Sequence, residues 1–524
     1  MRVTPKGGSS DKKSTYPEDD MSQTPEVRKK STGVSPDLQS NPGLELDSTR
    51  HPQPAHVWKI AFIDMWERFS FYSTQALLAF YLLYSLADGG LALNPVTATA
   101  IIGAYGACVQ LAQVVGSWIA DRLVPPKKMV MAGGFIVTVG HIALAVLPGL
   151  AGVGVGLVLI IIGTGAFKTN LTTILGMLYE ASDTRRDAGF TIYFTATNVG
   201  SILGPLLAGL TQSVWGFHAG FGIAAIGMVA GLIQFRAIYS RLPSDAGTVR
   251  APLRSTAWRG IVATTLVLLA LVALLAQLGW LSGDSLSTTM GVVIIGVIFA
   301  YFTIMFRSRE VSSTEKVRLR GLIPLCIAAT VFFGFTLQVF TTVPVFIGKS
   351  VDPRIGSLSV PAVWFVTTSA VAFVVVSPAV SYLWATMGPR QPSATSKMCI
   401  AFILVGLGYL GLALSASAFE SGTIPAILVI GCLALTGVAE IFMGPIVLSI
   451  GSRAMPTAFK SQGLAVMVLS IGGGSVISGF LGGWFTKMSE SMFFFMLTGI
   501  AISLAVVLLV INRPVSRLLN FVDK

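Results

Sequence analysis

Long blocks of apolar residues dominate this sequence and restrict what the chain can fold into. The blocks run for about 20–28 residues, the length at which an α-helix rising about 1.5 Å per residue crosses a bilayer. Strands of a membrane β-barrel would instead alternate in polarity over about ten residues, a pattern that these blocks lack. Only 11% of the residues are charged and the mean hydropathy is +0.75, whereas a soluble globular protein is about 25% charged. The sequence therefore predicts an all-α integral membrane protein.

The apolar blocks predict about fourteen transmembrane helices. Their approximate spans are 57–86, 95–120, 128–148, 153–177, 188–212, 217–239, 256–280, 288–306, 320–347, 360–386, 397–417, 423–450, 461–485 and 490–511. The pair 256–280 and 288–306 is very apolar and is flanked by the basic segments 240–256 and 307–319. Without this pair, six helices remain on either side, as in the major facilitator superfamily. We therefore expect two six-helix bundles and an inserted helix pair that faces lipid.

These patterns divide the chain into five parts. They are a disordered cytoplasmic tail (1–55), an N-terminal six-helix bundle (56–240), the inserted helix pair with its cytoplasmic basic loops (241–319), a C-terminal six-helix bundle (320–512) and a second cytoplasmic tail (513–524). The first tail carries eight basic and eight acidic side chains and almost no apolar clusters. Such a segment cannot bury enough surface to fold.

Basic residues are concentrated in one set of alternate loops. These loops hold nineteen Lys and Arg side chains, whereas the opposite loops hold only Lys349, Arg354 and Lys487. Because Lys and Arg are retained on the cytoplasmic side, we expect a multi-pass protein of the cell membrane with both termini in the cytoplasm. The net charge of +12 then reflects topology, and no binding of nucleic acid is expected.

The first predicted helix carries ionisable residues within its apolar block, in the segment DMWERFSFYS. An ionisable residue at the bilayer centre costs about 2.5–3.5 kcal/mol on insertion scales. At helical spacing, one face of this helix collects Asp64, Glu67, Arg68, Phe71, Tyr72 and Gln75. Arg68 can pair with Asp64 one turn away or with an acid across the bundle. The face is either a functional stripe turned inward or a structural ion pair that fixes helix packing.

Two further ionisable residues lie deep in apolar blocks, Lys168 in GTGAFKTN and Glu440 in GVAEIFMGP. Both need partners, which a central cavity shared with the charged stripe would provide. Such a cavity would combine two cations with three acids and would suit a zwitterion. Protonation of one acid would free a cation for the substrate carboxylate and couple the two events.

Asp121 and Arg122 lie in GSWIADRLVPPKK, at a predicted cytoplasmic loop. They suit a conformational relay that holds helix ends in one state, and ordinary loop charge is the alternative. The four cysteines lie singly, without metal-ligand or redox spacing. No HExxH, Walker or nucleophile-elbow motif is present. We therefore expect no metal, no cofactor and no enzymatic activity.

Several of these blocks resemble the proton-dependent oligopeptide transporter family (POT, also called PTR) of the major facilitator superfamily. DMWERFSFY is similar to the first-helix signature E-x-x-E-R-F-x-Y-Y, and GSWIADR, which follows Tyr105, to G-x-x-x-A-D-R. GTGAFKTN, TRRDAGFTIYFTATNVG and GVAEIFMGPIVLSIGSRA resemble blocks of the fourth, fifth and tenth family helices. The resemblance is good over about 57–240 and looser over 320–511.

The resemblance implies proton-coupled symport of di- and tripeptides or peptide-like compounds by alternating access. The implied proton-coupling network is Asp64, Glu67, Arg68 and Lys168. The implied substrate site is Arg68, Tyr72, Tyr105, Lys168, Asn198, Gln338 and Glu440. In this site Arg68, Lys168 and Tyr72 would hold the peptide carboxylate, and Glu440 the amino terminus. We expect the protein to work in the lipid bilayer as a monomer.

Some positions depart from the family pattern. Asp64 stands in place of a glutamate, and in FFGFTLQVF the residues Thr336 and Leu337 precede Gln338 where the family has a seventh-helix acid. The other changes are Phe71 for a tyrosine, Ser369-Ala370 for an Asn-Pro pair and Met467 for a tryptophan. They leave an alternative open, an exporter or facilitator of a modified peptide or secondary metabolite with altered or absent proton coupling.

Overall fold

A computed structural model describes residues 52–180, 183, 185–249, 252, 263, 270, 274–275, 277–280, 282, 285–387 and 390–519. The first helices are α1 (Val57–Leu83), α2 (Pro95–Arg122), α3 (Pro126–Val146), α4 (Gly149–Gly176), α5 (Arg186–Trp215) and α6 (Phe217–Ile238). The short turns η3 (Tyr239–Arg241) and η4 (Ser244–Gly247) and helix α8 (Leu286–Arg307) follow.

The rest of the chain is also helical. Its helices are α9 (Ser313–Thr336), η5 (Leu337–Phe340), α10 (Thr342–Ser350), α11 (Ala362–Met387), α12 (Ala394–Ala418), α13 (Ala426–Ile441), α14 (Gly444–Ala454), η7 (Thr457–Phe459), α15 (Lys460–Phe485) and α16 (Glu490–Leu519). Four two-residue strands join loops at one end: β1 (Val351–Asp352), β2 (Arg354–Ile355), β3 (Leu358–Ser359) and β4 (Ile424–Pro425). β1 pairs with β4 in parallel, and β2 with β3 in antiparallel.

Twelve helices of the described part are long and apolar enough to cross a membrane. α1 is also long enough, with 27 residues, but it is not among the twelve because it carries the charged residues Lys59, Asp64, Glu67 and Arg68. The predicted helix 256–280 lies largely outside the described residues. The prediction of an all-α membrane fold is therefore confirmed, whereas the number of fourteen helices is not.

Two predicted helices are interrupted in the structure, and proline explains both breaks. The span predicted at 423–450 divides into α13 and α14, because Pro445 has no N–H and its ring would collide with the carbonyl of Ile441. The span predicted at 320–347 becomes α9, η5 and α10, and Pro344, through the same effect on the carbonyl of Phe340, separates η5 from α10. Both breaks lie next to residues of the candidate site.

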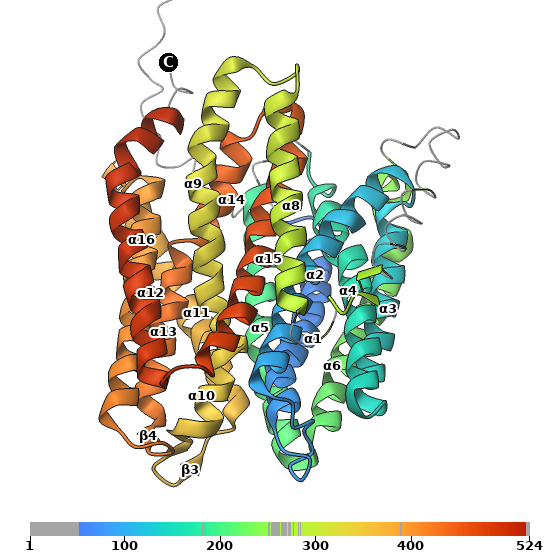
Figure 1. Cartoon of the computed structure of the whole chain (residues 1–524). Coiled ribbons are helices and arrows are strands. Elements are labelled where there is room, and N and C mark those ends of the chain that lie inside the picture. The colour runs from blue at the N-terminus through green and yellow to red at the C-terminus, as the bar shows by residue number, and fades with distance from the viewer. Residues whose placement is uncertain are drawn as a thin grey trace, which may run out of the picture. The chain divides into compact units, whose positions relative to one another are not determined.

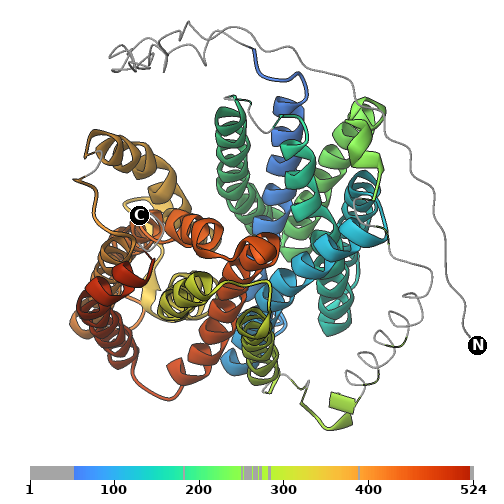
Figure 2. The same ribbon diagram turned by 90° about the horizontal axis from the view of Figure 1, so that it is seen from above.

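The helices form two groups, which Figure 2 shows on opposite sides of the molecule. In one group α1 packs on α5 and α6, and α3 packs on α4 and α6. In the other, α12 packs on α13 and α16, and α9 on α15 and α16 (Figure 1). The groups meet where α2 packs on α15 and α5 on α11. The bundle boundaries predicted at 56–240 and 320–512 stay a prediction.

Glycines allow α2 and α15 to approach closely. A Cβ atom on Gly103 would lie 2.8 Å from the carbonyl oxygen of Ser475 and 2.9 Å from Cα of Gly479. A Cβ atom on Gly479 would lie 2.8 Å from the carbonyl oxygen of Thr99. In a membrane, where lipid tails are as apolar as side chains, such close backbone packing is a main source of helix association.

α8 packs on the seam between α2 and α15. The Ser287 hydroxyl donates a hydrogen bond of 3.2 Å to the carbonyl of Ala100, and Ile294 is fully buried beside Ala107 and Val476. The opposite face of α8, with Val292, Ile295 and Phe299, is exposed. The expected contact with lipid therefore fits one face of α8, while the other face touches both helix groups.

Candidate substrate and proton site

The carboxylate of Asp64 lies at the centre of a ring of donors. Lys168 Nζ lies 2.6 Å from Oδ1 and 2.8 Å from Oδ2, Tyr193 Oη donates to Oδ1 at 2.6 Å, and Thr197 Oγ1 donates to Oδ2 at 2.5 Å. Asp64 itself is fully buried. Lys168 favours the carboxylate form, because its ammonium carries a positive charge and only donors, whereas the two hydroxyls can also accept a hydrogen bond.

Glycines of α5 bring the hydroxyl donors to Asp64. Tyr193 and Thr197 are four residues apart and therefore lie on one face of α5. One and two turns further on, a Cβ atom on Gly200 or Gly204 would overlap the backbone carbonyl oxygen of Met65 or Phe69 in α1. Any other residue at these positions would push α5 away from α1 and separate the hydroxyls from Asp64.

Arg68 forms a second ion pair beside the first one. Its Nε lies 2.5 Å from Oε2 of Glu67, and Nη2 lies 2.6 Å from Oε1, so the pair is bidentate. Both residues are buried. The guanidinium also lies 4.7 Å from the ring centroid of Phe71, a distance that allows a cation–π contact. The sequence suggested a pair between Arg68 and Asp64, whereas the structure pairs Arg68 with Glu67 and Asp64 with Lys168.

A cavity of about 410 Å³ adjoins the second ion pair through Arg68. Four predicted site residues line it, Arg68, Tyr72, Asn198 and Glu440. Glu440 lies in the last turn of α13, directly before the proline break. Among the described residues Glu440 has no ion-pair partner. The cavity thus receives a cation from one helix group and a carboxylate from the other.

Three predicted substrate residues do not line this cavity. Lys168 is held by Asp64, and Tyr105 is buried with its ring stacked on Phe71 at 6.1 Å between centroids. Gln338 is fully buried in η5, and Thr341 and Thr342 donate to its Oε1 at 3.2 and 2.5 Å. Its Nε2 donates to the carbonyl of Gly334, so the amide is satisfied within its own segment.

Asp121 and Arg122 lie exposed at the end of α2. In the part of the chain that the structure describes, neither side chain forms an ion pair. Their role as a conformational relay stays a prediction.

The sequence interpretation missed Tyr193 and Thr197, which supply two of the four hydrogen bonds to Asp64. Both lie in the segment TIYFTATN, which drew attention only to Asn198. Their spacing of four residues places both hydroxyls on one face of a helix and was the available signal. An uncharged side chain in an apolar helix, however, does not require a partner as a charged one does. No group of three or more His, Cys, Asp or Glu side chains that could bind a metal occurs among the described residues.

Known proteins resemble the chain over most of its length. The model of the POT family matches residues 127–500. A di-/tripeptide transporter of Lactococcus lactis subsp. lactis (strain IL1403) is 33% identical over 494 residues, which cover 91% of this chain and 98% of that protein. The uncharacterised transporter YclF of Bacillus subtilis (strain 168) is 31% identical over 465 residues, which cover 88% of this chain and 94% of YclF.

Solved structures agree with this relationship. A crystal structure of the peptide transporter POT in complex with sulfate matches with a TM-score of 0.85 and 29% identity, over 91% of this chain and 99% of that one. A POT family transporter in complex with 5-aminolevulinic acid matches with a TM-score of 0.85 and 27% identity, over 90% and 99%. The predicted major facilitator fold is thereby confirmed. This chain is a multi-pass membrane protein that belongs to the POT family of transporters.

Proposed function

We propose that this protein imports di- and tripeptides, or peptide-like compounds, together with protons. One observation carries the proposal. Arg68 and Glu440 are the only charged side chains among the described residues that line the cavity, and they come from different helix groups. A peptide zwitterion has one carboxylate for Arg68 and one ammonium for Glu440. The similarity to a di-/tripeptide transporter supports the same substrate class.

The balance of charges supports one proton per peptide. Asp64 and Lys168 neutralise each other, as do Glu67 and Arg68, so an ionised Glu440 leaves one negative charge in excess. A peptide carboxylate that takes Arg68 as its counter-ion competes with Glu67 for the one positive charge. Glu67 would then be a buried carboxylate without a counter-ion, which is unfavourable unless it takes up a proton. With that proton, the occupied site has no unpaired charge.

Glu67 then takes up the proton, and Asp64 remains a fixed counter-ion of Lys168. Asp64 accepts hydrogen bonds from three side chains, whereas Arg68 is the one hydrogen-bond donor to Glu67 among the described residues. Displacement of one partner therefore frees Glu67 but would leave Asp64 bound to the others. Where the family has a seventh-helix acid, Leu337 contributes an apolar side chain to the cavity. Proton coupling therefore depends on the acids of α1.

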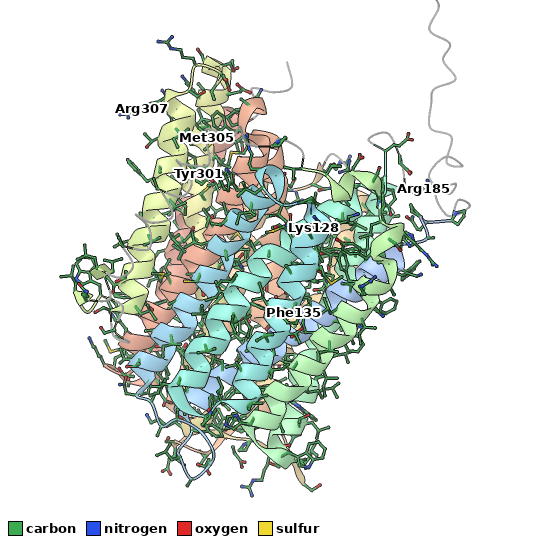
Figure 3. All side chains as sticks on the ribbon, turned by 90° about the vertical axis from the view of Figure 1, so that its right-hand side faces the viewer. Lys128, Phe135, Arg185, Tyr301, Met305 and Arg307 are labelled. Carbon is green, nitrogen blue, oxygen red and sulfur yellow. The ribbon has the colours of Figure 1, made fainter. Side chains whose placement is uncertain are left out.

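The orientation proposed from the loops agrees with the positions of the basic side chains. In Figure 3, Lys128, Arg185 and Arg307 lie toward the same end of the helices, and we propose that this end faces the cytoplasm. Both termini would then be cytoplasmic and the membrane would be the cell membrane. The bundles 56–240 and 320–512 would rock against each other in alternating access. Since one chain supplies the entire cavity, we propose that it works as a monomer.

Uptake of dialanine into proteoliposomes tests the proposal. We expect accumulation with an inward proton gradient, and equilibration without one. In Glu67→Gln, whose amide mimics the protonated acid, we expect exchange of dialanine to continue while accumulation is lost. Equilibration of dialanine in the wild type whatever the gradient would instead indicate a facilitator, and no movement of dialanine would contradict peptide transport.

A further inference from the structure

The helix group of α1 to α6 contains a buried histidine that the proposed mechanism does not use. His141 of α3 is fully buried, and its Nδ1 lies 3.1 Å from Oγ1 of Thr74 in α1, which is fully buried too. Nε2 of His141 is also buried and has no hydrogen-bond partner among the described residues. Because an unsatisfied buried polar group costs about 1–3 kcal/mol, packing alone does not account for a histidine at this position.

Two hydroxyl groups connect His141 with Glu67 along α1. Ser70 and Thr74 follow Glu67 by three and seven residues, so the three side chains lie on one face of the helix. Ser70 is fully buried, and its Oγ has no hydrogen-bond partner among the described residues. The same is true of Oγ1 of Thr164 in α4. Buried polar groups of this kind suit bridging water molecules, which need two to four polar partners each.

His218 extends this row toward the outer end of the helix group. α3 begins beside Lys128, at the end proposed to face the cytoplasm, and His141 lies near its other end. Leu144, one turn after His141, accepts a hydrogen bond of 3.1 Å from Nδ1 of His218, the second residue of α6. Since a carbonyl only accepts, Nδ1 of His218 carries the hydrogen. His218 is half-buried and is therefore closer to water than His141.

The helices around His141 offer few other groups that can bind a proton. α4 and α6 pack on α3, and Thr74 brings α1 against it. In their outer parts, 71–83, 149–162 and 217–228, no Asp, Glu, Lys or Arg occurs. The titratable side chains there are Tyr72, which lines the cavity, His218, and Tyr81, whose ring lies 5.7 Å from that of His218 between centroids. His218 and His141 are therefore the basic side chains on this route.

We infer that His141 relays protons from the outer face to Glu67 through the interior of this helix group. Ser70, Thr74, His141 and His218 are not among the residues that line the substrate cavity, so proton and peptide would reach the site by separate routes. The inference rests on the proposed function, because it takes Glu67 as the group that accepts the proton.

The relay needs no reactant besides water. An imidazole binds a proton on one nitrogen and releases another from the second. Nδ1 of His141 would pass its proton to the hydroxyl of Thr74, which gives up its own hydrogen to a water molecule. That water and the hydroxyl of Ser70 would repeat the step toward the carboxylate of Glu67. Side chains one turn apart lie about 5–6 Å from each other between Cβ atoms, a gap that one water molecule can bridge.

His141→Asn tests the relay. The amide of asparagine can still form a hydrogen bond with Thr74, but it does not take up and release a proton. We expect the initial rate of gradient-driven dialanine uptake into proteoliposomes to fall at least tenfold. Exchange of dialanine, which needs no net movement of protons, should stay within about twofold of the wild type. A histidine that only supports packing would change both rates alike, so an equal change in both rates, or no change in either, would overturn the inference.

A matched pair at Thr74 tests the next step of the route. Thr74→Val keeps the size of the side chain and removes the hydroxyl, whereas Thr74→Ser keeps the hydroxyl. We expect gradient-driven uptake to fall at least tenfold in Thr74→Val and to stay within about threefold of the wild type in Thr74→Ser, with exchange retained in both. Equal gradient-driven uptake in the two variants would contradict the relay, and this pair decides the question if His141→Asn does not fold. A wild type that fails to accumulate dialanine would instead contradict the proposed function itself.

Discussion

Asp64 and Glu67 lie one turn apart on α1 but have very different surroundings. Asp64 has four hydrogen bonds from the side chains of α4 and α5, and Glu67 has a single bidentate partner from its own helix. The sequence predicted that these acids, Arg68 and Lys168 act together. It did not predict the pairs, because helical spacing allows Arg68 to reach either acid and only the packing of α4 and α5 decides between them.

Thr197→Val tests how far the hydroxyl donors stabilise the carboxylate of Asp64. The change keeps the size of the side chain and removes the hydrogen bond to Oδ2, and a hydrogen bond to a charged group contributes about 1.5–3 kcal/mol. We expect thermal unfolding in detergent to shift to lower temperature by several degrees. Thr172→Val is the control, because the Thr172 hydroxyl contacts Tyr193 rather than Asp64. Equal shifts in the two variants would contradict a specific contribution of Thr197.

Lys168→Gln removes the counter-charge of Asp64. Breaking a buried ion pair by removing one partner typically costs about 3–5 kcal/mol, so we expect the single variant to be strongly destabilised. Addition of Asp64→Asn removes the unpaired charge and should recover most of the lost stability. Thermal unfolding of the single variants and the double variant measures the coupling between the two residues. Additive losses would show that Asp64 and Lys168 do not depend on each other.

At the level of helices, the sequence predicted the apolar spans well and their interruptions poorly. Hydropathy depends on composition, and the segments around Pro344 and Pro445 remain apolar although the backbone turns there. Gln338 was expected in the substrate site from the family resemblance, whereas the switch to η5 directs its amide to Thr341 and Thr342. The contact of α8 with the seam could not be predicted from an apolar helix without charges.

Crosslinks of α8 test its attachment to the two helix groups. Both the hydrogen bond of Ser287 and the sulfur contact of 3.5 Å between Cys108 and Met290 join α8 to α2. We therefore expect α8 to move with α2, so that a disulfide between Cys108 and Met290→Cys leaves dialanine uptake within about twofold.

A crosslink from α8 to α15 should have the opposite effect. A Cβ atom on Gly291 would lie 3.1 Å from Cγ1 of Val476, so Gly291→Cys with Val476→Cys can join the two helices. This disulfide would tie the helix groups together, and we expect uptake to fall at least tenfold and to recover with a reductant. In each experiment, every native cysteine that does not take part in the crosslink is replaced by alanine. Equal effects of the two crosslinks would contradict the attachment of α8 to one group.

For the whole molecule, the spacing of apolar blocks predicts two groups of helices, and the basic loops predict an orientation, which stays a prediction. The sequence does not determine which conformation is seen, because a transporter visits several conformations with one sequence. In this state, Trp364 Nε1 of α11 donates to the carbonyl of Leu206 in α5 at 3.0 Å. Tyr72 of α1 stacks on Phe340 of η5 at 6.4 Å between centroids. Both contacts hold the helix groups together on the side of α10.

Trp364→Phe tests whether the hydrogen bond to Leu206 keeps this side closed. The change keeps an aromatic ring and removes the N–H, and a hydrogen bond contributes about 0.5–1.5 kcal/mol. We expect the ratio of closed to open protein to fall by a factor of about 2–12. Labelling of Ser201→Cys, in a protein without its native cysteines, by a reagent confined to the outer face measures the change. Unchanged labelling would show that other contacts close the cavity.

The ion pair of Asp64 with Lys168 also governs how the chain can be made. α1 leaves the ribosome first, but Lys168 follows 104 residues later and Thr197 133 residues later. Until then α1 would carry an unpaired carboxylate into hydrocarbon, at a cost of about 2.5–3.5 kcal/mol on insertion scales. We therefore expect α1 to wait at the translocon or at the water interface. A nascent chain cut short before α4 should leave its first helix outside the bilayer.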